Sequence, residues 1–178
     1  DQLGLIEHAE DTAEAFARTQ GETHGLYVVP AFTGLGAPYW QPQARGLITG
    51  LTLDSDKDHL ITAFLQSVAY QTRTLLDAMA ADGAPVTTLR VDGGMVVNEA
   101  FCQFLCDVLD VPVQRPVDVE TTVRGAGVLA AIGAGLLADL QEAAALWRLG
   151  ADFVPTMPMA KRQELLAGYA RAVARTLT

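Results

Sequence analysis

The chain has few of the residues that build metal or disulfide sites, because its 178 residues include only two cysteines and three histidines. Cys102 and Cys106 lie four residues apart in an apolar helical pattern, without the further cysteine or histidine that a zinc site needs. His8, His24 and His59 show no metal-ligand spacing. We therefore expect no metal site in the chain, and we expect two core thiols of the kind that suits a reducing cytoplasm.

Basic residues are also scarce, since twelve lysines and arginines stand against 21 acidic residues and the formal net charge is −9. The basic residues are scattered along the chain, which argues against a nucleic-acid surface. The longest apolar segment, residues 125–137, is shorter than the roughly 20 residues that a membrane-spanning helix requires. Half of the residues are hydrophobic, so we expect a soluble globular domain with a substantial core.

Hydrophobic periodicity predicts an alternation of strands and helices. It places strands at residues 26–29, 87–91 and 113–115, helices at residues 56–81, 99–110, 122–137, 140–149 and 161–175, and a linker at residues 153–159. From residue 87 onward the order is strand, helix, strand, helix, which implies an α/β fold of parallel strands with crossover helices. Ligands of such folds bind at the carboxyl ends of the strands, where Gly93 and Gly94 fall.

The predicted helix at residues 56–81 carries several local signals. Ser55 and Asp58 form a capping-box pattern at its start. Its polar face includes Gln66, Tyr70 and Arg73, which we expect to be solvated or structural, with Arg73 able to pair across a domain interface.

A glycine-rich helix start offers a rival function. Gly125, Gly127 and Ala130 fit the spacing of a dinucleotide-binding fingerprint, which would indicate an oxidoreductase. Such a fingerprint directly follows a hydrophobic strand, whereas residues 116–122 are polar. Close packing of the helix is therefore the preferred interpretation of these glycines.

The most distinctive segment is residues 29–50, with the sequence VPAFTGLGAPYWQPQARGLITG, which we call the aromatic loop. Its glycines, prolines and three aromatic residues predict an ordered turn system that the aromatic side chains anchor. From the chemistry alone, a well-packed surface loop is an equally good interpretation.

The aromatic loop and four later motifs together resemble the carboxy-terminal half of glycerol kinases, which are FGGY carbohydrate kinases. The later motifs are GLT at residues 50–52, AYQTR at residues 69–73, LRVDGG at residues 89–94 followed by Asn98, and ETT with Gly-Ala-Gly at residues 120–127. Two positions depart from the usual family pattern: Gln41 replaces a common aspartate, and Val123-Arg124 replaces a small or apolar pair.

The resemblance implies the carboxy-terminal part of an actin-like, ribonuclease H-like ATPase domain. It implies that residues 1–178 form the nucleotide-binding side, with the amino-terminal domain and the start of this domain absent. A three-stranded meander of that missing part would pair with the strand at residues 87–91. The chain would then depend on the rest of its own polypeptide or associate with a second copy.

The resemblance also implies the reaction, in which ATP with Mg²⁺ phosphorylates glycerol in the cytoplasm. Gly94 and Asn98 match the residues that hold the nucleotide, and Gly93 is a weaker candidate; a turn glycine followed by an ordinary helix cap is the alternative. The family's catalytic base lies in a Gly-Asp-Gln motif, which this sequence lacks, and Asp92 is not expected to replace it. We therefore expect no catalytic residue and no activity in this chain alone. Another FGGY sugar kinase, or a non-catalytic interaction module on the same scaffold, remains open.

Overall fold

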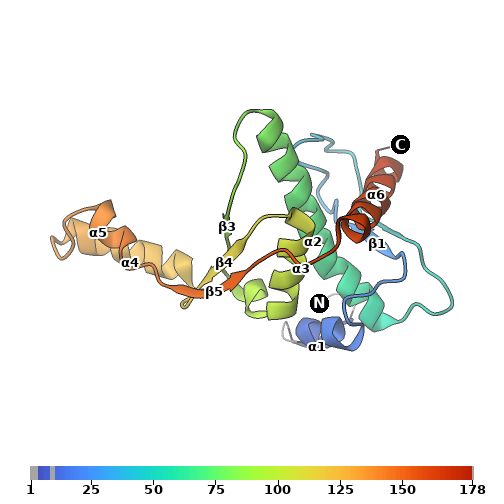
Figure 1. Ribbon diagram of the computed structural model, residues 1–178, viewed down its shortest axis with the longest axis horizontal. Coiled ribbons are helices and arrows are strands. Elements are labelled where there is room, and N and C mark those ends of the chain that lie inside the picture. The colour runs from blue at the N-terminus through green and yellow to red at the C-terminus, as the bar shows by residue number, and fades with distance from the viewer. Residues whose placement is uncertain (1–3, 9–10, 178) are drawn as a thin grey trace.

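The computed structural model describes residues 4–8 and 11–177 of the chain (Figure 1). Its elements, in chain order, are α1 (Asp11–Arg18), β1 (Tyr27–Val29), β2 (Leu47–Thr49), α2 (Lys57–Ala81), β3 (Leu89–Arg90), the 3-10 helix η1 (Gly94–Val97), α3 (Glu99–Leu109), β4 (Val113–Pro116), α4 (Thr121–Gly133), α5 (Leu140–Ala144), β5 (Leu149–Phe153) and α6 (Met159–Thr176).

The core lies where the long helix α2 meets α1, α3 and α6 (Figure 1). The ring of Tyr70 stacks on that of Tyr169 from α6, with 4.9 Å between centroids, and meets that of Phe104 from α3 edge-on. Cys102 and Cys106 are both fully buried, and neither forms a disulfide, so the prediction of core thiols is confirmed. Burial raises the pKa of each thiol to about 11.

In the described part of the chain, five short strands form two separate sheets. β1 and β2 are antiparallel, whereas β3 and β4 are parallel and α3 connects them, which confirms the predicted crossover. β5 extends the second sheet on the other side of β4 and runs antiparallel to it. The helix predicted at residues 140–149 is wrong in its length, since α5 ends at Ala144, and β5 occupies residue 149, residue 153 of the predicted linker and the residues between them. The segment LGADF has no strand periodicity of its own and becomes a strand by pairing with β4.

The start of α2 is capped by a different pair from the one predicted. Asp56 is the cap and accepts from the backbone amide of His59 at 3.0 Å, while the His59 side chain accepts from the Asp56 amide. Ser55 instead accepts from the amide of Thr52 at 2.9 Å. The Asp56 cap belongs to the same type of reciprocal arrangement, moved by one residue.

Two residues of the predicted polar face of α2 are buried. Tyr70 is 2% exposed and Gln66 is 1% exposed, because α1 and α6 cover this face, and the Gln66 amide donates to the Gly21 carbonyl. Arg73 has partners within the described part of the chain. Its guanidinium donates to the carbonyl oxygens of Val108 and Leu109 at the end of α3.

The aromatic loop is held by fewer aromatic side chains than predicted. Leu35 is buried and exchanges two backbone hydrogen bonds of 2.9 Å with Gln41, and Tyr39 packs against the core. Phe32 and Trp40 are 71% and 74% exposed. Only Tyr39 among the three aromatic residues therefore anchors this loop in the core.

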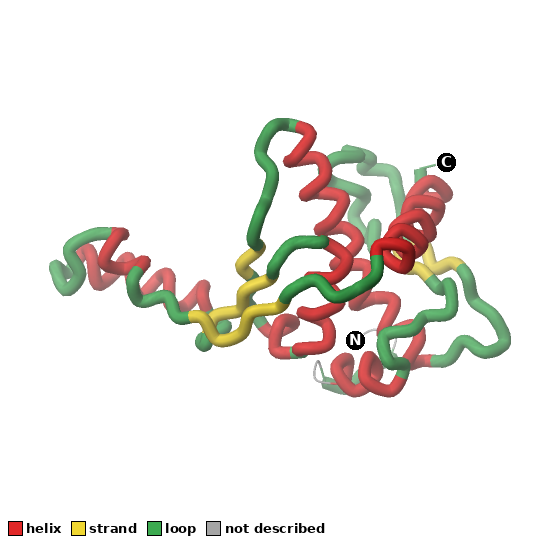
Figure 2. The backbone as a smooth tube through the Cα atoms, viewed as in Figure 1, coloured by secondary structure: helices red, strands yellow, loops and turns green. Residues whose placement is uncertain are grey.

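Helices α4 and α5 project away from the body, beyond the β3-β4-β5 sheet (Figures 1 and 2). No described residue of α4 is buried, and a Cβ added at Gly125 or Gly127 would meet nothing within 4 Å. The prediction that these glycines allow close helix packing is wrong for the described residues, since no other element approaches either glycine in them. Arg124, one of the two departures from the family pattern, donates to the Leu146 carbonyl and ties α4 to the segment after α5.

Candidate functional site

A tight turn connects the end of β3 to η1 and contains two of the predicted site residues. Gly93 has a φ of 86°, a backbone conformation that glycine adopts without strain. Its amide donates to the Val119 carbonyl at 2.9 Å, so the turn is tied to the segment after β4. A side chain at Gly94 would meet nothing within 4 Å. The backbone of Gly94 is therefore open to a ligand.

Asn98 stands one turn further on, between η1 and α3. Its Oδ1 accepts from the backbone amide of Phe101 at 3.1 Å, so the predicted helix cap is confirmed. The other end of the same side-chain amide, Nδ2, is buried and has no hydrogen-bond partner in the described part of the chain. A buried donor without a partner costs about 1–3 kcal/mol, so an acceptor on a ligand would remove a real penalty.

A cavity of about 660 Å³ adjoins both residues. Apolar side chains form most of its wall; the described lining is Ile6, Thr12, Ala13, Leu65, Gly94, Met95, Val97 and Asn98. A second hollow of about 310 Å³ shares four of these residues and reaches Phe32 and Phe64, whose rings stack at 6.5 Å. The two hollows together form an apolar slot with one unpaired amide donor at its edge.

The charges around this slot are few. Asp92, at the end of β3, is exposed to solvent. Among the described residues, no group of three histidine, cysteine, aspartate or glutamate side chains could hold a metal ion. The start of α3 adds the partial positive charge of its free amides, which favours an anion or a polarised acceptor. The site thus combines an apolar wall with one unpaired amide donor, and its described residues include no group of metal ligands.

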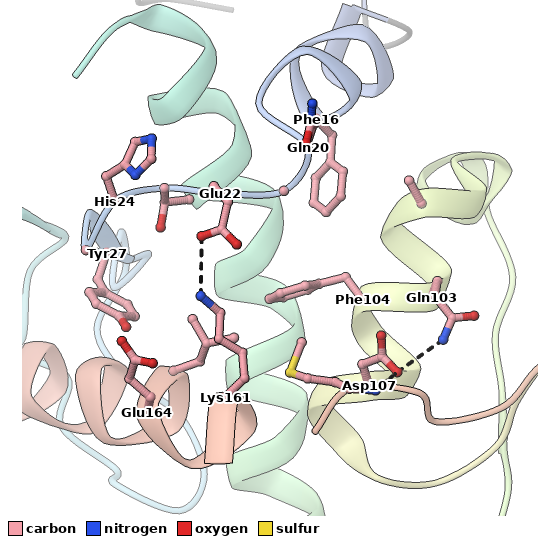
Figure 3. Close-up of a pocket in the computed structure, with 16 residues that line it drawn as sticks. Phe16, Gln20, Glu22, His24, Tyr27, Gln103, Phe104, Asp107, Lys161 and Glu164 are labelled. Carbon is pink, nitrogen blue, oxygen red and sulfur yellow. Dashed lines mark hydrogen bonds and ion pairs between the residues drawn. The ribbon is translucent and has the colours of Figure 1, made fainter. Parts of the chain in front are cut away.

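A further cavity of about 660 Å³ lies between the segment after α1, α3 and α6 (Figure 3). Three of its charged groups, Lys161, Glu22 and Asp107, have partners. Lys161 pairs with Glu22 at 3.4 Å, and Asp107 accepts from the amide of Thr156 at 2.6 Å and from the side chain of Gln103 at 3.1 Å (Figure 3). No buried polar side-chain atom without a partner lines this cavity in the described part of the chain. It lacks the feature that marks the slot beside Asn98.

The structure brings together all three residues that the sequence analysis selected, since Gly93, Gly94 and Asn98 lie in one turn and helix start. The structure also shows residues that line the slot and that were not predicted from the sequence. Ile6 and Leu65 carry no signal beyond a hydrophobic position, because their part in the slot depends on how α1 and α2 pack against η1.

Comparisons with known proteins agree with the sequence motifs. The family model described as the carboxy-terminal domain of the FGGY family of carbohydrate kinases matches residues 2–134. Glycerol kinase 1 of Pseudomonas aeruginosa is 51% identical over 175 residues, and a glycerol kinase of Alcanivorax borkumensis is 53% identical over 176 residues. These matches cover 98% of this chain, and the chain spans about 35% of the length of each relative.

Among solved structures, a crystal structure of Plasmodium falciparum glycerol kinase with ADP matches with a TM-score of 0.85 and 32% identity. The match covers 99% of this chain and 35% of that one. The resemblance seen in the sequence motifs is confirmed, and the fold is the predicted actin-like, ribonuclease H-like one. Since the family model covers well over half of its length, the chain belongs to the FGGY family of carbohydrate kinases.

Proposed function

We propose that residues 1–178 are the carboxy-terminal part of an ATP-dependent glycerol kinase, which transfers the γ-phosphoryl group of ATP to glycerol and produces glycerol 3-phosphate. Relatives about half identical to this chain are glycerol kinases, which supports this reaction over that of another sugar kinase. We call the full-length enzyme the parent kinase. We place this enzyme in the cytoplasm, where buried thiols such as Cys102 and Cys106 stay reduced.

The observation that carries the proposal is the buried Nδ2 of Asn98, which lacks a partner among the described residues. In the proposal this donor bonds to an acceptor atom of the nucleotide, and the apolar slot holds the flat adenine ring. Gly94 has no side chain to obstruct the approach, and Gly93 provides the turn that presents it. The ADP in the Plasmodium falciparum glycerol kinase structure supports a nucleotide as the ligand of this domain.

Phosphoryl transfer depends on positioning and on charge neutralisation, and this chain contributes to the first. Mg²⁺ neutralises charge on the transferred phosphates when it is bound. Since no described cluster of acidic or imidazole groups could hold it, we assign no residue of this chain to Mg²⁺. Nor does the sequence hold the family's Gly-Asp-Gln motif for the catalytic base. The described residues therefore bind and orient the nucleotide, and the chain alone should not phosphorylate glycerol in a coupled assay.

Replacement of Gly94 tests the nucleotide site in the parent kinase. A Cβ added at this position meets no atom within 4 Å in the structure, so we expect Gly94→Val to fold and to obstruct the ligand. We expect the KM for ATP to rise by about tenfold or more, while the KM for glycerol changes by less than about twofold. Gly36→Val, at another open glycine in the aromatic loop, is the matched control and should leave both constants unchanged.

The result that contradicts the proposal is a folded Gly94→Val enzyme with an unchanged KM for ATP. An equal rise in both constants would also contradict it, because the substitution would then act on the whole active site. A panel of sugar alcohols as acceptors separates a glycerol kinase from another FGGY kinase. A full-length protein that turns over none of them would instead be the non-catalytic module.

A further inference from the structure

Arg115 of β4 reaches across to the turn that carries the proposed nucleotide site. Its Nη1 donates to the carbonyl oxygens of Val96 at 2.8 Å and Val97 at 3.3 Å, the last two residues of η1. Its Nη2 donates to the carboxylate of Glu99, the first residue of α3, at 2.9 Å. One guanidinium thus forms hydrogen bonds with residues on both sides of Asn98.

The hydrogen bonds of Arg115 are partly shielded from solvent. The Arg115 side chain is only 16% exposed, although Glu99 is 72% exposed, and the guanidinium lies 5.9 Å from the centre of the Phe153 ring on β5. The Val96 carbonyl also accepts from the buried thiol of Cys102 at 3.2 Å. Hydrogen bonds from a charged donor are stronger than neutral ones, and partial burial limits screening by water.

The turn gains from such support because the hydrogen bonds at its two ends are long. The amide of Val96 donates to the carbonyl of the cap residue Gly93 at 3.3 Å, and the amide of the cap residue Asn98 donates to the Met95 carbonyl at 3.3 Å. Both distances exceed the usual range for such bonds, and four-residue 3-10 helices have poor hydrogen-bond geometry. The bond of 2.8 Å from Arg115 to Val96 is shorter than either of these two bonds, so we expect it to contribute strongly to the position of η1.

We propose that Arg115 is a positioning residue for nucleotide binding. It fixes η1 to β4 and so keeps Gly94 and the unpaired Nδ2 of Asn98 in place for the ligand, without contacting the ligand itself. This inference rests on the proposed function. Lysine cannot replace it fully, because three acceptors on two elements require the planar, forked donor set of a guanidinium.

The chain contains a matched control for this inference. Arg73 of α2 is 27% exposed and also donates to two backbone carbonyls, those of Val108 and Leu109, and to one carboxylate, that of Asp77. These carbonyls lie at the opposite end of α3 from Asn98. Loss of Arg73 therefore removes a similar number of bonds, two of them to α3, without touching η1.

The test compares Arg115→Gln, Arg115→Lys and Arg73→Gln in the parent kinase, with melting temperatures measured for each. We expect Arg115→Gln to raise the KM for ATP by about tenfold while kcat and the KM for glycerol stay within about twofold. Arg115→Lys, which keeps one charged donor, should show a smaller rise. Arg73→Gln should lower the melting temperature and leave the KM for ATP unchanged.

Two results would overturn the inference. One is an unchanged KM for ATP in folded Arg115→Lys or Arg115→Gln enzyme. The other is an equal rise in Arg73→Gln, which would show that general stability, and not the position of η1, sets nucleotide affinity. If Gly94→Val raises the KM for ATP while the Arg115 variants do not, the inference fails and the proposed function stands. If Gly94→Val leaves the KM for ATP unchanged, the proposed nucleotide site is wrong, and the inference that depends on it is wrong as well.

Discussion

Asn98 and Phe101 are joined by a hydrogen bond of 3.1 Å that uses only half of the asparagine side-chain amide. Oδ1 accepts from the Phe101 backbone and caps α3, while Nδ2 remains buried and without a partner among the described residues. The fold requires only the oxygen, because serine, threonine or aspartate would cap the helix as well. The proposed nucleotide contact therefore depends on the nitrogen, which the cap does not use.

Replacement by alanine should have opposite effects on stability at two glycines, Gly168 of α6, which faces β1, and Gly127 of α4. A Cβ at Gly168 would overlap the Tyr27 side chain, whereas a Cβ at Gly127 in α4 would meet nothing within 4 Å. Gly127→Ala should stabilise the chain by about 0.5–1 kcal/mol, because alanine favours the helix. Gly168→Ala should destabilise it by about 1–3 kcal/mol through overpacking. Urea denaturation measures both; stabilisation by Gly168→Ala would show that α6 does not approach β1 so closely.

Exposed surface near β3 and on α4 predicts association of the purified chain. β3 is an edge strand of its sheet in the described part of the chain, and Val123 and Leu129 of α4 are 71% and 63% exposed. Free strand edges and apolar patches favour contact with a second copy. Sedimentation at micromolar concentration should show a dimer or larger species, and a double Val123→Glu, Leu129→Glu variant should shift it towards monomer.

A compact monomer with slow amide exchange along β3 would contradict that prediction. It would show that the strand edge and α4 are covered in some other way. The same experiment on the parent kinase separates contacts between copies from contacts within one polypeptide.

Elements with strong local signals could be predicted from the sequence. The periodic apolar residues of α2 and the stop at residues 82–83 give its bounds almost to the residue, and Asn98 identifies the start of α3. β5 could not be predicted, because Gly150 and Asp152 disfavour a strand and only pairing with β4 makes it one. The burial of Tyr70 was missed for a similar reason, since α6 covers it from far along the sequence.

The candidate site likewise contains residues with local sequence signals and residues that only tertiary packing brings there. Gly93, Gly94 and Asn98 are close in sequence: local signals predicted the turn and the helix cap, and the resemblance to glycerol kinases added the nucleotide role. The apolar wall comes in part from α2 and the segment before α1, and the support comes from Arg115 on β4. Such contributions depend on tertiary packing, and neither Leu65 nor Arg115 stands out from its neighbours in the sequence.

Asn98 offers the most direct measurement of the nucleotide site, because its two roles can be separated. Asn98→Ser keeps a helix cap and removes Nδ2, whereas Asn98→Ala removes both and should lose about 1 kcal/mol of stability. In the parent kinase, we predict that both variants raise the KM for ATP by about tenfold, the loss expected for one ligand hydrogen bond. Only Asn98→Ala should lower the melting temperature. A normal KM for ATP in folded Asn98→Ser enzyme would show that Nδ2 binds no nucleotide and that Asn98 is only a helix cap.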